Sequence, residues 1–260
     1  MKLNNSITFL WVAFSLLLNS FQSLADDSSI ESISIAVPIS APFVFKDELG
    51  KPQGFLIELF ALVERKTGLK TSITIMPWAR AMHEVKVNRI DALMPALYTD
   101  ERAELFVYPK LSLTESSTVF LKRSQDDIVI GDITQLGTEK LIVKVRGMSM
   151  GKAFDDAERV GLINVIGVRD DEQAIQMLVT SRVDLFASID YISNFSLTKL
   201  NLHDKIDILN FSNEKKPSYL VFSQAFAKQH NVDVLMKKIN EVKSSSQYHE
   251  LVDKFLKLKN

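Results

Sequence analysis

The sequence contains no cysteine among its 260 residues. This absence excludes a disulfide framework, a thiolate nucleophile, a lipid-anchored lipoprotein and a Cys-ligated metal, so the core has to be stable without cross-links. Histidine is scarce as well, because the four histidines are isolated and neither an HExxH motif nor a carboxylate-rich metal loop occurs. The sequence therefore predicts no metal site and no cofactor.

An excess of charge of one sign is also missing. Lys and Arg number 31 against 32 Asp and Glu, the net charge is -1, and no basic run occurs. Nucleic-acid binding and polybasic membrane attachment thus lose their usual electrostatic basis. With 46% hydrophobic and 24% charged residues, the composition is that of a globular protein long enough for one large or two small domains.

Long apolar runs are absent except near the N-terminus. Phe9 to Leu18 is almost wholly apolar, Lys2 is the only charged residue before Asp26, and Ser23-Leu24-Ala25 supplies small residues for cleavage. The apolar core is shorter than the roughly 20 residues that span a bilayer, so residues 1–25 are predicted to be a cleaved signal peptide. An uncleaved N-terminal anchor is the alternative. The prediction places the mature protein in the periplasm.

Strand and helix patterns alternate after the leader. Hydrophobic periodicity predicts strands at 32–37, 69–76 and 90–97, and helices at 54–67, which ends at Gly68, and at 78–87. In the second helix Ala79, Met82 and either Val85 or Val87 are expected to face inward. Such alternation predicts an α/β fold with a parallel sheet and crossover helices.

A polar stretch, Lys122 to Asp127, fits a domain boundary better than the interior of an element. The alternation then restarts, with strands predicted at 141–145, 163–168, 184–187 and 219–222, and helices at 149–160, 170–180, 232–242 and 248–256. The sequence therefore predicts two α/β units.

The segment from Pro77 to Arg102 places the Trp78 ring and the guanidinium groups of Arg80 and Arg102 around the end of a buried strand. Thr99 is a good N-cap for the helix that follows, and free N–H groups at such a helix start attract an anion that Arg102 can hold by two parallel hydrogen bonds. The alternative is an ordinary capped helix with a solvated arginine.

Several short motifs occur in a specific order and spacing: Ala41-Pro42-Phe43, Pro77-Trp78, Arg89-Ile90-Asp91-Ala92, Thr99-x-Glu101-Arg102 and Arg146-Gly147-x-Ser149. Together they make the whole mature chain resemble the family 3 extracellular solute-binding proteins, periplasmic receptors for polar amino acids and related small molecules. The resemblance implies a type II periplasmic-binding fold, in which two α/β lobes are joined by a two-segment hinge and the ligand lies between them.

The resemblance also implies a division of the chain. Residues 26–121 together with 218–260 would form the first, discontinuous lobe, and residues 122–217 the inserted second lobe. The two crossings are expected near 119–123 and 213–219. Closure about such a hinge would trap the ligand and change the surface that a partner reads.

The family's arginine in the T-x-x-R motif grips the ligand's carboxylate, and Arg102 occupies that place. Trp78 and Phe43 are expected in the pocket wall. From the second lobe Gly147 and Ser149 follow a strand and are predicted to open a helix whose free N–H groups cradle an anion, with Arg146 adding positive charge.

Other positions leave alternatives open. Arg80 can bind a second anionic group or form a surface salt bridge, and Tyr98 can face the cleft or cover the lobe surface. The aspartate that holds a ligand's ammonium group in the family is expected where this chain has Ile189, so Asp190 and Ser188 compete for that role. Val37 likewise stands where these receptors often have an acid.

The predicted function is that of a monomeric, non-catalytic periplasmic receptor that captures a small carboxylate-bearing solute and presents it to an ABC permease. A free-standing receptor for a signalling membrane protein is an alternative. Gly147-Met148-Ser149-Met150-Gly151 also fits the G-x-S-x-G motif of serine hydrolases, for which Asp184 or Asp190 and His203 or His230 would complete a triad. A dehydratase related to these receptors is a further enzyme alternative.

Overall fold

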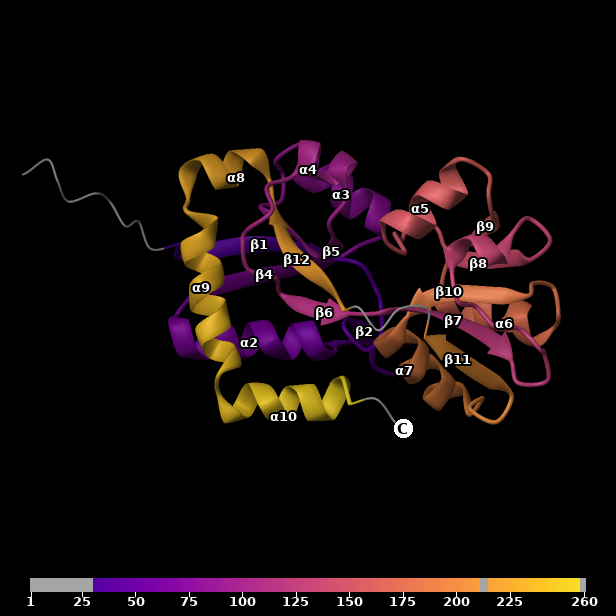
Figure 1. Ribbon diagram of the computed structural model, residues 1–260. Coiled ribbons are helices and arrows are strands. Elements are labelled where there is room, and N and C mark those ends of the chain that lie inside the picture. Colours follow the sequence, from indigo (N-terminus) through magenta and orange to yellow (C-terminus); the bar gives the residue numbers. More distant parts are fainter. Residues whose placement is uncertain (1–29, 211–214, 258–260) are drawn as a thin grey trace, which may run out of the picture. The chain divides into compact units, whose positions relative to one another are not determined.

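The computed structural model of the protein describes residues 30–210 and 215–257 (Figure 1). The predicted signal peptide, residues 1–25, lies outside the described residues. Within the part that is described, no helix is both long and apolar enough to cross a membrane. The described chain contains two five-stranded mixed sheets, called here the first sheet and the second sheet, and each is flanked by helices.

The first sheet has the strand order β4-β1-β5-β12-β6. Its strands are β1 (Ser32–Val37), β4 (Lys70–Ile75), β5 (Ala92–Leu97), β6 (Thr114–Ser116) and β12 (Lys216–Phe222). Strand β1 pairs in parallel with β4 and β5, whereas β12 runs antiparallel to β5 and β6. A short hairpin, β2 (Phe45–Lys46) and β3 (Pro52–Gln53), lies outside it. The predicted parallel pairing with crossover helices is thus confirmed.

The second sheet has the strand order β11-β7-β10-β8-β9. Its strands are β7 (Thr118–Arg123), β8 (Leu141–Val145), β9 (Asn164–Val168), β10 (Leu185–Ile189) and β11 (Ile206–Asn210). Strand β10 is buried on both faces, because Phe186 packs into one hydrophobic cluster and Leu185 and Ala187 pack into another. Its continuous apolar sequence is typical of such a central strand.

The helices are α2 (Phe55–Thr67), α3 (Trp78–Lys86), α4 (Asp100–Leu105), α5 (Lys152–Arg159), α6 (Asp171–Val179), α7 (Asp190–Leu200), α8 (Gln224–Gln229), α9 (Val232–Lys243) and α10 (Ser246–Phe255), with a 3-10 turn at Ile133–Leu136. Figure 1 shows α9 and α10, near the C-terminal end, beside α2. Helix α2 ends as predicted at Gly68, whose left-handed φ of 75° lets its N–H bond to the Glu64 carbonyl.

The inward face of helix α3 agrees with the prediction at Met82 and Val85 and differs from it at Ala79. Ala81 and Val85 are fully buried, whereas Ala79 and Val87 are exposed. Trp78 and Met82, which are half-buried, share the inner face with Ala81 and Val85 at spacings of three and four residues. The choice of Ala79 was therefore wrong by about half a turn of the helix.

The chain passes from the first sheet to the second at Ser117, between β6 and β7. The first crossing was expected near residues 119–123; these residues belong to β7, and the passage at Ser117 precedes them by two residues. Lys122 is buried within this strand because its ammonium group lies 3.0 Å from the Asp207 carboxylate, and Arg123 donates to the carbonyls of Leu178 and Val183. Lys122 and Arg123 therefore lie inside a strand, whereas residues 124–127 follow β7, so the prediction that the stretch lies outside an element is wrong only for its first two residues.

The return crossing lies between the end of β11 at Asn210 and the start of β12 at Lys216, and it includes residues 211–214, outside the described part. The last strand, predicted at 219–222, begins at Lys216 and joins the first sheet. Two crossing segments therefore connect the sheets, as in a two-lobed binding fold.

Candidate binding cleft

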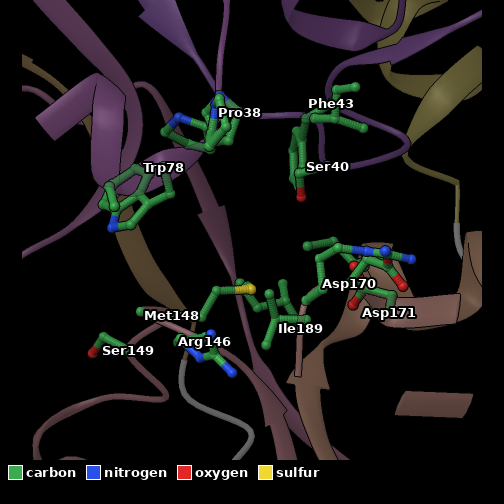
Figure 2. Close-up of a pocket in the computed structure, with 18 of the residues that line it drawn as sticks. Pro38, Ser40, Phe43, Trp78, Arg146, Met148, Ser149, Asp170, Asp171 and Ile189 are labelled. Carbon is green, nitrogen blue, oxygen red and sulfur yellow. The ribbon is translucent and has the colours of Figure 1, made fainter. Parts of the chain in front are cut away.

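Residues that follow strands of both sheets line one cavity of about 690 Å³ (Figure 2). Most of its lining is apolar and includes Pro38, Phe43, Trp78, Met148 and Ile189. The charged side chains that line it are few: Lys46, Arg102, Arg146, Arg169, Asp170 and Asp171. Ser40, Ser116, Ser149 and Ser218 add hydroxyl groups. A largely apolar cavity with a few polar groups is typical of a small-molecule site.

Arg102 reaches this cavity from the first turn of α4. The helix begins as predicted after Thr99, whose hydroxyl accepts a hydrogen bond from the Arg102 N–H at 3.2 Å. The guanidinium group stacks on Trp78, with Cζ 4.9 Å from the ring centroid. It donates from Nη1 to the Leu97 carbonyl at 3.1 Å and from Nη2 to the Gly147 carbonyl at 3.2 Å. Arg102 thus joins segments that follow strands of the two different sheets.

Burial lowers the pKa of Arg102, but a guanidinium group stays charged in proteins at any physiological pH. The same environment acts on Tyr108, which donates to the Leu97 carbonyl at 2.9 Å. Burial raises the pKa of the Tyr108 hydroxyl to about 12, so this group is a neutral donor. A fixed positive charge is therefore held at the wall of an apolar cavity.

Trp78, the first residue of α3, forms the wall beside Arg102. Its Nε1 is buried and has no hydrogen-bond partner among the described residues. Gly147 packs against its ring so closely that a Cβ atom there would lie 3.2 Å from Trp78 Cδ1. Gly147 also has a positive φ of 80°, which disfavours other residues. Both observations explain the glycine at this position.

The segment Gly147 to Ser149 does not open a helix, contrary to the prediction of a helix at 149–160. Helix α5 begins three residues later, at Lys152, with Gly151 as its N-cap. The Ser149 hydroxyl donates instead to the Asp155 carboxylate and accepts from the Gly151 N–H. The predicted helix-end anion cradle is thus not formed at Gly147 and Ser149, although both residues line the cavity.

The catalytic triad considered for Ser149 is not assembled either. Ser149 has no histidine partner among the described residues, because His203 is 2.9 Å from the Thr198 hydroxyl and His230 packs on the Phe226 ring. Asp184 accepts the Leu141 N–H. The G-x-S-x-G motif here is a turn without hydrolase geometry.

Asp190 and Ser188, the two candidates for holding an ammonium group, are not among the residues that line the cavity, whereas Ile189 between them is. The Asp190 carboxylate accepts the Tyr191 N–H at 2.8 Å, and burial raises the Asp190 pKa. Ser188 is almost fully buried, and its hydroxyl has no hydrogen-bond partner among the described residues. Ligand contact by Asp190 remains an untested prediction.

The remaining predicted residues divide into two groups. Phe43 and Arg146 line the cavity, and Arg146 donates from Nη2 to the Gly167 carbonyl at 3.2 Å. Arg80 and Tyr98 are not among the lining residues. Arg80 is exposed and 3.9 Å from the Glu84 carboxylate, and Tyr98 packs its ring on Tyr108. For Arg80 the alternative of a surface salt bridge describes the structure.

Four charged lining residues were missed: Lys46 in β2 and, at the start of α6, Arg169, Asp170 and Asp171. Asp170 caps this helix and pairs with Arg169 at 2.7 Å. Burial raises the pKa of Asp171 from 3.8 to about 6. Sheet register could have indicated the last three, because β8 and β9 run in parallel with Val145 beside Val168, which places the residues after Val168 next to Arg146.

Among the described residues, no group of three or more His, Asp or Glu side chains could hold a metal ion. Of the charged residues of the cavity, Arg146 lies apart from Asp170 and Asp171 (Figure 2). The arrangement supports reversible recognition of a small molecule by ionic and apolar contacts.

The sequence matches a known protein family and a curated relative. The model of the bacterial extracellular solute-binding proteins, family 3, matches residues 33–258. A curated relative, the probable amino-acid-binding protein YxeM of Bacillus subtilis (strain 168), is 23% identical over 227 residues, which cover 86% of this chain and 81% of the relative.

Two solved structures have the same fold. An ancestral arginine-binding protein bound to arginine superposes with a TM-score of 0.73 at 18% identity and covers 87% of this chain and 99% of its own. A substrate-binding protein of an ABC uptake transporter from Streptococcus pneumoniae, with bound histidine, has a TM-score of 0.70 at 20% identity and covers 91% and 96%.

Proposed function

Because this chain belongs to the bacterial extracellular solute-binding proteins, family 3, we propose that it captures a small carboxylate-bearing solute in the cleft for an ABC-type importer. The observation that carries the proposal is the position of Arg102, whose charged group lies at the wall of a mostly apolar cavity. An amino acid or a similar compound fits this site, as the names of the relatives suggest.

The geometry around Arg102 supports carboxylate binding. A planar guanidinium group holds a carboxylate by two parallel hydrogen bonds, which are roughly twice as strong as neutral ones. At present its two terminal nitrogens donate to the Leu97 and Gly147 carbonyls. A ligand carboxylate would replace at least the second contact, and the unpartnered Nε1 of Trp78 is a further donor on the same wall.

Replacement of the Arg102–Gly147 hydrogen bond by a contact with the ligand would also couple binding to lobe closure. Gly147 follows β8 of the second sheet, whereas Arg102 follows β5 of the first sheet. A ligand held between these segments would stabilise the closed arrangement of the two lobes, and the permease would recognise the resulting change in the outer surface. We propose that the protein works as a monomer in the periplasm and catalyses no reaction.

A ligand screen tests this function. A solute that binds the native state alone raises the melting temperature, so the purified mature protein should respond in a thermal-shift screen to amino acids or organic acids. Matched amines that lack a carboxylate serve as the control set. A response to polyamines in preference to every carboxylate would overturn the proposal.

A further inference from the structure

The cleft has two chemically different ends. Figure 2 shows Trp78 and Ser149 on one side and Asp170 and Asp171 on the other, with Met148, Ile189 and Arg146 in between. The Arg102 guanidinium belongs to the Trp78 side, because its Cζ lies 4.9 Å from the Trp78 ring centroid. A cationic end and an acidic end are therefore separated by a mostly apolar stretch that Arg146 borders.

Asp171 carries the argument at the acidic end. Its Oδ1 is buried and has no hydrogen-bond partner among the described residues, and the side chain forms no ion pair there. A carboxylate with a buried oxygen that lacks a hydrogen-bond partner and a counter-charge is costly, and a ligand cation is the group that would best offset this cost. Burial also raises the pKa of Asp171 to about 6, in agreement with a carboxylate that lacks a counter-charge.

The neighbouring charges do not supply that partner. Arg169, the nearest cation in sequence, binds the Asp170 carboxylate at 2.7 Å. Arg146 is exposed and donates to the Gly167 carbonyl. Glu172, the next acid along helix α6, binds Lys199 at 2.6 Å and is not among the residues that line the cleft. Asp171 is thus the acid of the described cleft lining that has no ion pair.

We propose, on the basis of the function proposed above, that the ligand is a zwitterion whose cationic group is separated from its carboxylate by an apolar chain. The carboxylate binds Arg102, the chain passes Met148 and Ile189, and the distal ammonium group binds Asp171. A compact α-amino acid cannot join both ends, because its two charged groups share one carbon atom. Lysine and ω-amino acids have the required form.

Four probes of similar length test this inference by isothermal titration calorimetry on the mature protein. L-lysine and 6-aminohexanoate carry both a carboxylate and a distal ammonium group, L-norleucine lacks the distal ammonium group, and cadaverine lacks the carboxylate. L-lysine and 6-aminohexanoate should bind at least about tenfold more tightly than L-norleucine, since only they can form a charge-assisted hydrogen bond with Asp171.

Variants then assign the effect to one residue. Asp171→Asn should weaken the binding of L-lysine by about tenfold to a hundredfold and leave L-norleucine unchanged. Glu172→Gln is the matched control, because it removes a neighbouring charge of the same helix turn outside the cleft, and it should leave both affinities unchanged. Circular dichroism verifies that both variants fold.

The outcomes separate the two proposals. Any of four outcomes would overturn the distal-cation site. L-norleucine and L-lysine bind equally tightly, or Asp171→Asn affects both equally. Alternatively, Asp190→Asn rather than Asp171→Asn removes the selectivity, or neither zwitterion binds at millimolar concentration. Cadaverine binding as tightly as L-lysine would instead overturn the carboxylate function on which the site rests.

Discussion

The two ends of the cleft differ in how far the protein itself supplies hydrogen-bond partners to their charged side chains. At the Trp78 end the Arg102 guanidinium has two carbonyl acceptors and an aromatic ring. At the other end Asp171 has a buried oxygen without a hydrogen bond among the described residues. A ligand therefore exchanges hydrogen bonds at the first end, whereas it supplies the missing partner at the second.

This difference assigns separate roles to the two ends. Net gains are small where one hydrogen bond replaces another, and large penalties arise where a buried charge is left without a partner. Arg102 would accordingly provide orientation and couple the ligand to lobe closure, and Asp171 would provide selectivity for a cationic group. The predictions below alter one end at a time.

The largest effect is expected for Arg102→Ala. It would leave the ligand's carboxylate desolvated without a cation, at a cost of about 3 to 4 kcal/mol, or a hundredfold to a thousandfold in Kd by calorimetry. Arg102→Lys keeps the charge but not the planar fork, so it should recover only part of the affinity. Unchanged affinity in the alanine variant, with an intact circular dichroism spectrum, would contradict the role of Arg102.

A smaller effect is expected for Trp78→Ala. The ring covers the Arg102 guanidinium, and such a contact contributes about 0.5 to 2 kcal/mol, so the affinity should fall by about tenfold. Trp78→Phe retains a ring without Nε1 and serves as the control that separates stacking from donation. An alanine variant that binds as tightly as the parent would show that Trp78 is only a packing residue.

The acidic end should make binding depend on pH. Burial raises the Asp171 pKa most, and its charged neighbours Asp170 and Glu172 raise it further, with a result of about 6. Only the ionised carboxylate attracts an ammonium group, so affinity for L-lysine is present above pH 6 and is lost as the pH falls through that value.

Calorimetry at two pH values measures this dependence. L-lysine should bind about tenfold more weakly at about pH 5 than at about pH 7, because its own charged groups do not titrate in this range. The Asp171→Asn variant is the control and should show no such change. The folding stability of the free protein has the opposite pH dependence, since a raised carboxyl pKa makes the fold less stable as the pH increases from about 4 to 6. An equal pH dependence in the variant would contradict the assignment.

Local sequence patterns predicted the Arg102 end and missed the Asp171 end. The helix cap at Thr99 and the helix start at Trp78 each depend only on residues within one turn of that position, so both were visible in the sequence. The position of Asp171 depends on the pairing of β8 with β9, which brings Val168 beside Val145. Asp170 and Asp171 therefore seemed to be only the start of a helix.

The errors in the fold have a similar cause. Lys122 and Arg123 indicated a boundary, because their partners Asp207, Leu178 and Val183 are far along the chain. The start of α5 was predicted too early because Gly147 and Ser149 resemble a helix start, whereas Ser149 binds Asp155 across a turn. Periodicity alone predicted β1 and α2 correctly, since a buried stripe needs no distant partner.

The smallest expected effect concerns the contact between the two walls at the Trp78 end. Gly147→Ala places a Cβ atom 3.2 Å from Trp78 Cδ1 on a backbone with a φ of 80°, whereas Gly161→Ala has a φ of 74° and no atom within 4 Å. Both variants should lose about 1 kcal/mol of unfolding free energy through backbone strain, which lowers the melting temperature by about 2 to 4 °C. Only Gly147→Ala should also weaken ligand binding, by about threefold, because it separates Trp78 from the Gly147 segment and loosens the Arg102 contact with the Gly147 carbonyl. Equal affinities in the two variants would show that the cleft does not need this close approach.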